Sequence, residues 1–224
     1  MTSSEYNPIP FPFTRRDEGD MRARAEAFLA EMEQRRSVRF FSDDPVPRDL
    51  VERAIETAST APSGAHRQPW HFVAISNADL KREIRIAAER EEKESYERRM
   101  PDEWLEALRP FGTDWHKPYL ETVPWIVVVF AEQFQVKEDG WKRKNYYVQE
   151  SVGIACGLFV AALHHMGLTT LTHTPNPMHF LSQLLDRPPN EKPYILFPIG
   201  FPSDDATVPD IGRKPLDEIA VFKE

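Results

Sequence analysis

Residues 125–131, with the sequence WIVVVFA, form a continuous apolar run that is rich in β-branched side chains. Such a run is typical of a strand that is buried on both faces, because a strand with one solvent-exposed face has alternating apolar and polar residues. The run therefore predicts the central strand of a sheet that has helices packed against both of its sides.

The stretches on either side of this run supply the other elements. Short apolar segments predict strands, and apolar residues at intervals of three and four predict helices. No internal repeat and no low-complexity segment occurs, which indicates a single α+β or mixed α/β domain. The predicted strands are HFVAIS (71–76), TTLTHT (169–174) and YILFPIGF (194–201), and the predicted helices are 21–36, 48–59, 78–99, DEWLEAL (102–108), 146–166 and 178–185.

Composition limits the class of protein. The chain has 224 residues, of which 41% are hydrophobic, and this is enough for one well-buried core. A net charge of -8 argues against a nucleic-acid binder, which needs a basic surface. The N-terminus has no basic start followed by an apolar run, so no signal peptide is predicted. The longest apolar stretch, 152–163, is too short to span a bilayer and indicates a buried core helix. We therefore expect a soluble, cytoplasmic protein without a membrane partner.

The first 20 residues have the composition of an extended arm. Three prolines alternate with three large apolar residues between positions 8 and 13. Because exposed apolar side chains are costly, we expect this arm to lie on the body of the protein or on a partner subunit. Residues 21–224 are then the folded domain.

Several common catalytic motifs are missing from the sequence. The single cysteine, Cys156, excludes an internal disulfide and a cysteine-clustered metal site, and it is typical of a small buried hydrophobic residue. His164 and His165 are adjacent, so on a helix they point to different sides. The spacings HExxH, GxSxG, GxxxxGK[ST] and GxGxxG do not occur. No metal site is therefore predicted.

Three short stretches are candidates for contacts with a flat, anionic ligand. RRSVR (35–39) offers forked guanidinium donors that match phosphate oxygens, or it is a solvated helix end. PSG (62–64) would let a planar ring approach the main chain, or it is an ordinary turn. THT (172–174) ends a predicted strand, where polar side chains often face a ligand, or it has a capping role.

Glu92, Tyr96 and Lys117 form a second candidate set. Glu92 and Tyr96 are four residues apart on the predicted helix 78–99 and share one face of it. Lys117 follows a turn at Gly112 and could fold back over them. An anionic, a phenolic and a cationic group together could bind a zwitterion, whereas the alternative is that all three belong to a charged, solvated helix surface.

These stretches together carry a resemblance to a known family. RRSVRFFS, TAPSGAHRQPW, NYYVQESVGIACG, LTHTP and ATVPDIGRKPLD occur in the order and spacing of the iodotyrosine deiodinase branch of the FMN-dependent nitroreductase superfamily. The chain resembles that branch from about residue 30 to residue 220. The resemblance implies an α+β, nitroreductase-like fold with a central mixed sheet flanked by helices, and an interlocked homodimer that exchanges its terminal arms.

The resemblance also implies that FMN is the cofactor and that its two sites lie at the subunit interface. The stretch 35–39 and Arg213 would hold the phosphate and ribityl chain, while the other chain would supply the turn 62–64 to the flavin ring. Thr174 would be catalytic, with its hydroxyl near flavin N5. The implied cofactor-binding residues are Arg35, Arg36, Ser37, Val38, Arg39, Pro62, Ser63, Gly64, Thr172, His173, Thr174 and Arg213.

The implied substrate is a halogenated tyrosine such as 3-iodo-L-tyrosine, which FMN-dependent reductive dehalogenation would convert to tyrosine and halide. Glu92 would bind its ammonium group, Lys117 its carboxylate, and Tyr96 the same end of the molecule. Ala65 would donate its backbone N–H to the phenolate. The three clamp residues belong to a lid at about 88–120, and an external donor, NAD(P)H or a reductase, would supply electrons.

Three other functions remain open at this point, and one of them is a purely structural or interaction module, which would be colourless as purified. A general nitroreductase or quinone reductase on the same fold would have no special affinity for tyrosine derivatives. A flavin-bound amino-acid sensor would bind halotyrosine without turning it over.

Overall fold

The computed structural model describes residues 6–224. These divide into two compact units, and the boundary along the chain lies between Gln34 and Arg35. In the first unit, residues 6–17 have no helix or strand, and helix α1 spans Glu18–Gln34. Residues 1–5 of the predicted arm lie outside the described residues. The helix predicted over 21–36 is thus present, but none of its residues is buried, and Phe28 and Leu29 are more than half exposed.

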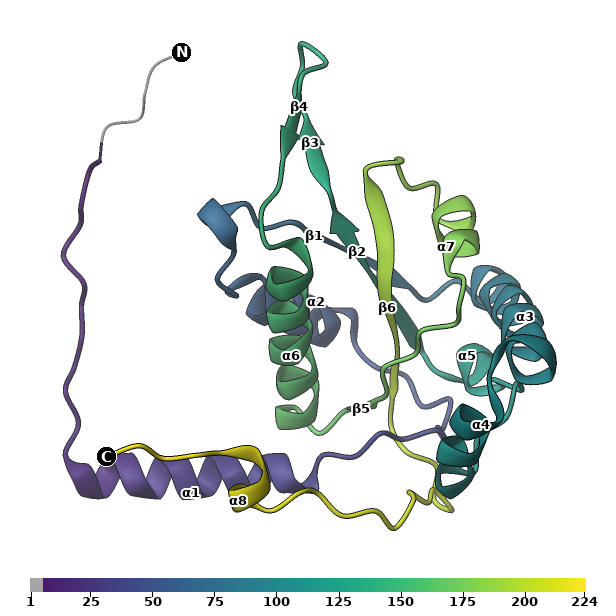
Figure 1. Cartoon of the computed structure of the whole chain (residues 1–224), viewed down its shortest axis with the longest axis horizontal. Helices are drawn as coiled ribbons and strands as arrows, with labels where there is room; N and C mark the ends of the chain where they lie inside the picture. The colour runs from purple at the N-terminus through teal and green to yellow at the C-terminus, as the bar shows by residue number, and fades with distance from the viewer. Residues whose placement is uncertain (1–5) are drawn as a thin grey trace. The chain divides into compact units, whose positions relative to one another are not determined.

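The second unit is built on a four-stranded sheet with the order β1-β2-β6-β5 (Figure 1). The strands are β1 (Trp70–Ile75), β2 (Trp125–Glu132), β5 (Thr169–Thr170) and β6 (Glu191–Gly200). All the named strands pair antiparallel. The parallel part of the predicted mixed sheet is an isolated bridge between Ser37 and Thr170.

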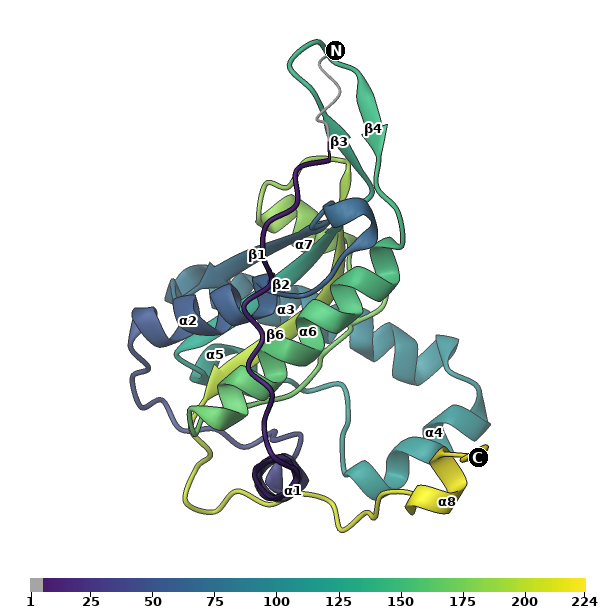
Figure 2. The same cartoon turned by 90° about the vertical axis from the view of Figure 1, so that its left-hand side faces the viewer.

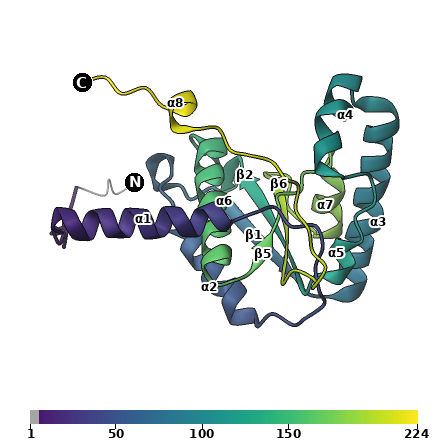
Figure 3. The same ribbon diagram turned by 90° about the horizontal axis from the view of Figure 1, so that it is seen from below.

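Helices cover both faces of this sheet. Helices α2 (Arg48–Ser59) and α6 (Val148–His165) lie on one face, and α3 (Ala78–Glu94), α5 (Tyr119–Thr122) and α7 (His179–Leu184) lie on the other (Figures 1 and 3). The central strand β2 divides its side chains between the two layers. Ile126, Val128 and Phe130 enter the core under α3, whereas the intervening Val127, Val129 and Ala131 enter the core under α2 and α6. The prediction of a strand buried on both faces is therefore confirmed.

The remaining elements are short. A two-stranded hairpin, β3 (Phe134–Val136) and β4 (Lys142–Lys144), projects beyond the end of the sheet (Figures 1 and 2). Helix α8 (Leu216–Ile219) lies near the C-terminus. The others are the 3-10 turn η1 (Gly64–His66), the π-helical turn η2 (Ser95–Arg99), α4 (Asp102–Leu108) and the 3-10 turn η3 (Arg109–Phe111).

Two elements differ from the sequence-based prediction. Only the first two residues of the predicted strand 169–174 pair in the sheet, although His173 still exchanges two backbone hydrogen bonds with Leu196, at 2.8 and 2.9 Å. The predicted core helix at 152–163 buries one face only, because Ile154 and Gly157 on α6 are exposed. Among residues 6–224, no helix combines the length and apolar character needed to cross a bilayer.

Candidate active site

The arginine cluster consists of Arg35, Arg36, Arg39 and Arg213. Residues 37 and 38 lie beside β5, where the Val38 N–H donates to the Thr170 carbonyl at 3.2 Å. Because Val38 points into the core, its neighbours Ser37 and Arg39 face outward. The cluster lines a cavity of about 220 Å³, together with Ser37, Phe111, Pro209, Ile211 and Gly212.

Hydrogen bonds to main-chain carbonyls hold this cavity together. Arg213 Nη2 donates to the Arg35 carbonyl at 2.9 Å, and Arg36 Nη2 donates to the Pro209 carbonyl. Burial lowers the pKa of Arg35, and the nearby charges of Arg213 and Arg36 lower it further. An anion in the cavity would relieve this repulsion, and the planar donors suit phosphate oxygens.

The small-residue turn at 62–65 is shaped by its own chain. A Cβ on Gly64 would lie 2.7 Å from the Tyr146 carbonyl oxygen, just before α6, so only glycine fits. Ala65 has a φ of 49° and a ψ of 32°, which is the left-handed region. Ser63 Oγ accepts a hydrogen bond from the Gln68 N–H at 2.9 Å. The small residues therefore allow close packing against α6, whatever ligand lies on their outer side.

The side chains of residues 172–174 alternate between exposed and buried, as they do in a strand, although these residues lie outside β5. Thr172 and Thr174 are exposed, and His173 between them is buried. The two threonine hydroxyls are thus available to a ligand. The His173 side chain points inward, so any contact that this residue makes with a cofactor comes from its main chain.

Glu92, Tyr96 and Lys117 lie together in the structure. Lys117 Nζ is 3.8 Å from Glu92 Oε2 and 5.7 Å from the centre of the Tyr96 ring, and the Tyr96 hydroxyl donates to the Thr113 carbonyl at 3.4 Å. Glu92 and Lys117 are 9% and 4% exposed, so neither belongs to a solvated helix surface. Burial lowers the pKa of Lys117 and raises that of Tyr96, while the charge of Glu92 raises both.

Sequence reasoning missed two contacts of this set, one with Glu89 and one with His173, which was expected only as a cofactor-binding residue. His173 Nε2 is 3.2 Å from Glu92 Oε1, which links the stretch 172–174 to the clamp. Glu89 Oε1 accepts a hydrogen bond from the Lys117 N–H at 2.7 Å. The position of Glu89, three residues before Glu92 on one helix, was a usable signal. The contact of His173 depends on tertiary packing and left no pattern in the sequence.

The candidate segments of one chain lie at opposite ends of its sheet. The turn at 62–65 precedes Trp70, which pairs with Ala131 opposite Lys192 at the start of β6. The arginine cluster adjoins the other end, where β5 pairs with Gly200. A second cavity beside the cluster, of about 470 Å³, is lined by Arg39, Tyr119, residues 110–114 and residues 207–209 among others, but residues 62–65 line neither cavity. Within residues 6–224, no cluster of three or more His, Cys, Asp or Glu residues could hold a metal ion.

Comparisons with known proteins agree with this architecture. The sequence pattern of the nitroreductase family matches residues 32–201. The iodotyrosine deiodinase of Haliscomenobacter hydrossis is 53% identical over 96% of this chain and 96% of that protein. Iodotyrosine deiodinase 1 of Mus musculus is 46% identical over 95% of this chain and 75% of that protein.

Solved structures show the same likeness. A crystal structure of oxidized iodotyrosine deiodinase bound to FMN and 3-iodo-L-tyrosine superposes with a TM-score of 0.74 and 28% identity, covering 87% of this chain and all of that one. A nitroreductase-like protein from Streptococcus mutans has a TM-score of 0.66 at 19% identity, over 90% of this chain and all of that one, and shows a shared fold.

Proposed function

The chain belongs to the nitroreductase family, and within it to the iodotyrosine deiodinases; from this premise we propose that it is an FMN-dependent enzyme that reductively dehalogenates halotyrosine. The observation that carries the proposal is the set of Glu92, Tyr96 and Lys117, in which the two charged side chains are buried and lie 3.8 Å apart. A general nitroreductase has no use for paired opposite charges in its lid, whereas a free amino acid presents an ammonium and a carboxylate that need both.

The arginine cluster fits the phosphate of FMN. Its donors are planar guanidinium groups, it lines a cavity, and the pKa of Arg35 is lowered by burial and by neighbouring like charges. We propose that Arg35, Arg36, Ser37, Arg39 and Arg213 hold the phosphate and ribityl chain, with the buried Val38 fixing the course of this segment. FMN, when bound and reduced, would supply the two electrons that, together with one proton, replace the carbon–halogen bond by a carbon–hydrogen bond and release halide.

The remaining site residues orient the substrate. Glu92 would bind the ammonium group, Lys117 the carboxylate, and Tyr96 the same end through its hydroxyl. The Ala65 N–H would bind the phenolate oxygen, and Thr172 and Thr174 would line the ring, with the Thr174 hydroxyl placed to hydrogen-bond at flavin N5. Closure of residues 88–120 over the amino acid would exclude water, which strengthens these charged contacts.

We propose that the protein is a homodimer, and the positions of these segments support this. Because 62–65 and the arginine cluster are at opposite ends of one sheet, a ligand that touches both is best enclosed by two chains. The outer face of α6 supports such an interface, since Ile154, Gly157, Leu158 and Ala161 are apolar and at least partly exposed.

Anaerobic mixing of the reduced FMN-loaded protein with 3-iodo-L-tyrosine tests the function. We expect flavin reoxidation and iodide release with matching rates and one iodide per flavin. Binding without iodide release would favour the amino-acid sensor. Fast turnover of nitroaromatics with no binding of 3-iodo-L-tyrosine would favour the general nitroreductase. An external reductant, NAD(P)H or a reductase, is needed for repeated turnover.

A further inference from the structure

We propose that Glu89 is a positioning residue of this active site, which fixes the main chain at Lys117 so that the lysine ammonium is held where the substrate carboxylate meets it. The inference rests on the function proposed above, and it assigns to Glu89 a role in recognising the amino-acid end of the substrate. Glu89 does this without touching the substrate.

The first observation is a polar stripe along one face of the helix that runs through α3 and η2. The stripe consists of Lys81, Arg85, Glu89, Glu92 and Tyr96, whose intervals of four, four, three and four residues place them on one side. Each member contacts the segment 113–123, and the contacts run in reverse order along the two stretches. Tyr96 bonds to Thr113, Glu92 and Glu89 contact Lys117, Arg85 bonds to Glu121, and Lys81 Nζ bonds to the carbonyls of Glu121 and Val123.

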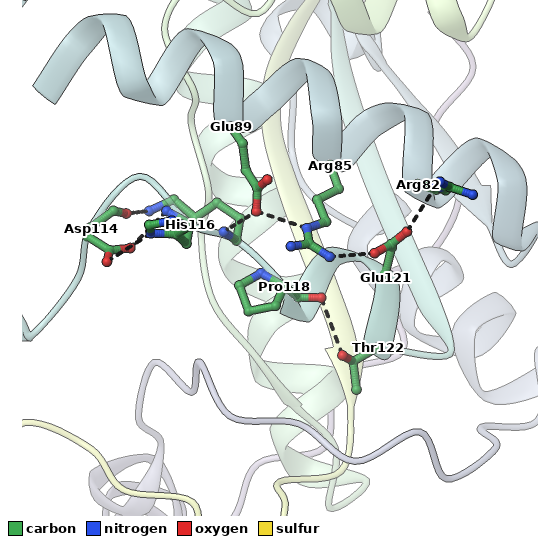
Figure 4. Close-up of polar contacts among 9 residues, drawn as sticks. Arg82, Arg85, Glu89, Asp114, His116, Pro118, Glu121 and Thr122 are labelled. Carbon is green, nitrogen blue, oxygen red and sulfur yellow. Dashed lines mark hydrogen bonds and ion pairs between the residues drawn. The ribbon is translucent and has the colours of Figure 1, made fainter. Parts of the chain in front are cut away.

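Glu89 is the middle member of this stripe, and Figure 4 shows its contact with Arg85 and the further contacts from Arg85 to Glu121 and from Glu121 to Arg82. Its Oε1 accepts from the Lys117 N–H at 2.7 Å and from Arg85 Nε at 2.9 Å. Arg85 in turn bonds through Nη1 to Glu121, whose other oxygen lies 3.9 Å from Arg82. The hydrogen bond to Glu89 is the largest cause of a raised pKa at Arg85. The Glu89 carboxylate therefore contacts two groups at once. The charged guanidinium of Arg85 fixes its position, and the carboxylate in turn accepts the hydrogen bond from the Lys117 amide.

The anchoring matters because the lysine ammonium stands on a flexible four-carbon stem. Its position depends on where the main chain is fixed, and the next residue, Pro118, has no N–H that could serve as a second anchor. At its far end, Lys117 Nζ contacts Thr113 Oγ1 at 3.3 Å, the Asp114 carbonyl and Glu92. Without Glu89 the main chain could shift while these contacts reform, and a displacement of about 1 Å is enough to impair a charged contact with a substrate.

The test compares Glu89→Ala and Glu89→Gln with Glu83→Ala, an exposed glutamate on the same helix. Binding of 3-iodo-L-tyrosine to the oxidised FMN-loaded protein is followed by quenching of flavin fluorescence. We expect Glu89→Ala to raise Kd about tenfold, because it removes a hydrogen bond to a charged group. Glu89→Gln should have a smaller effect, since its amide oxygen still accepts from the Lys117 N–H. Glu83→Ala should bind as the wild type does.

Two further measurements separate positioning from general destabilisation. In a Lys117→Met background, Glu89→Ala should cause no further loss of affinity, because its effect passes through the lysine. Binding of 2-iodophenol, which has no amino-acid end, should be unchanged by either Glu89 substitution. Equal losses for 2-iodophenol and 3-iodo-L-tyrosine, or a full tenfold loss in the Lys117→Met background, would overturn the proposal.

Hydrogen exchange at the Lys117 amide provides a readout that does not depend on catalysis. Exchange at this amide should be faster in Glu89→Ala than in wild type and Glu83→Ala, while exchange in β2 stays the same. If the wild-type protein released no iodide, the proposed function would fail, yet faster exchange would still support the anchoring contact. Unchanged exchange at Lys117 in a folded Glu89→Ala protein would overturn it, whereas Glu89→Gln, which keeps an acceptor oxygen, should exchange more slowly than Glu89→Ala.

Discussion

At the scale of single residues, the two charged members of the clamp, which consists of Glu92, Tyr96 and Lys117, pair with each other. Lys117 Nζ and Glu92 Oε2 are 3.8 Å apart, and both side chains are almost fully buried. A zwitterion could replace each partner with a group of the same charge, since its ammonium would take the place of the lysine and its carboxylate that of the glutamate. Substrate binding then exchanges ion pairs and leaves no buried charge unpaired, which is the arrangement that costs least.

Replacing Glu92 with glutamine should therefore weaken substrate binding. The change leaves the substrate ammonium without a charged partner, so we expect the free energy of binding 3-iodo-L-tyrosine to be less favourable by ~1–3 kcal/mol. Titration of the FMN-loaded variant by flavin fluorescence measures this. Glu94→Gln, on the same helix but more exposed, is the control. Wild-type affinity in Glu92→Gln would remove this residue from the clamp.

His173 makes a testable contribution to acid stability. Burial lowers its pKa below the ordinary 6.5, and its Nδ1 is buried without a hydrogen-bond partner among the described residues. As pH falls below 6.5 the unfolded chain takes up the proton before the folded one does. The stability associated with neutral His173 is therefore present above pH 6.5 and is lost as pH falls toward the lowered pKa.

Substitution of His173 with glutamine should remove this pH dependence. Between pH 6.5 and the lowered pKa, the wild type should lose up to about 1.4 kcal/mol of unfolding free energy per pH unit more than His173→Gln does. Urea unfolding of both proteins at pH 7 and pH 5 gives the difference, in which the titratable groups that do not contact His173 cancel. Parallel pH profiles would show that His173 is not the group responsible.

At the scale of elements, the sequence predicted those with strong apolar periodicity. Helix 48–59, helix 102–108 and strand 125–131 are present with boundaries that agree within one residue. The β3–β4 hairpin was missed because β4 is the charged triplet KRK, all of it exposed. Helix 78–99 was predicted as uniform, but it becomes π-helical from Ser95, which is a local widening that apolar spacing does not reveal.

In the candidate site, too, some features could be predicted from the sequence and others could not. Arg35, Arg36, Arg39 and Arg213 gather as the family resemblance implied, although 178 residues separate the first from the last. The contact between His173 and Glu92 was not predictable, because it joins residues that are 81 positions apart on different elements. Local patterns report helices and strands, whereas contacts of this kind appear only when the core brings the elements together.

Gly64, the first residue of η1, packs against the two residues that precede α6 and should be intolerant of substitution. An alanine Cβ would lie 2.7 Å from the Tyr146 carbonyl oxygen and 3.0 Å from Tyr147 Cδ2, so main chain has to move. We expect Gly64→Ala to reduce unfolding free energy by ~1–3 kcal/mol, the usual cost of overpacking, and to reduce FMN retention. Ala65→Gly is the matched control, because it relieves a left-handed alanine and should be nearly neutral. Equal stabilities of the two variants in urea unfolding would contradict the close packing.

At the scale of the whole molecule, the isolated chain leaves large apolar surfaces open. Besides the outer face of α6, the C-terminal residues Leu216, Ile219, Val221 and Phe222 are more than 60% exposed. Large exposed apolar residues so concentrated are typical of interfaces between chains. The sequence alone indicated this only through its arm and the family resemblance. No apolar pattern distinguishes a helix face that meets its own core from one that meets a second copy.

A charge on the outer face of α6 should separate the proposed dimer. Ile154 is 47% exposed in the single chain, so Ile154→Arg is compatible with its fold, whereas an unpaired guanidinium buried between two chains is costly. By light scattering, the wild type should have twice the 26.0 kDa of one chain, and Ile154→Arg should approach the mass of one chain and lose its visible flavin absorbance. Ser59→Arg, which is exposed at the end of α2, should stay dimeric and yellow. A monomeric Ile154→Arg protein that keeps FMN would show that one chain completes the cofactor site by itself, and the argument from opposite ends of the sheet would then be wrong.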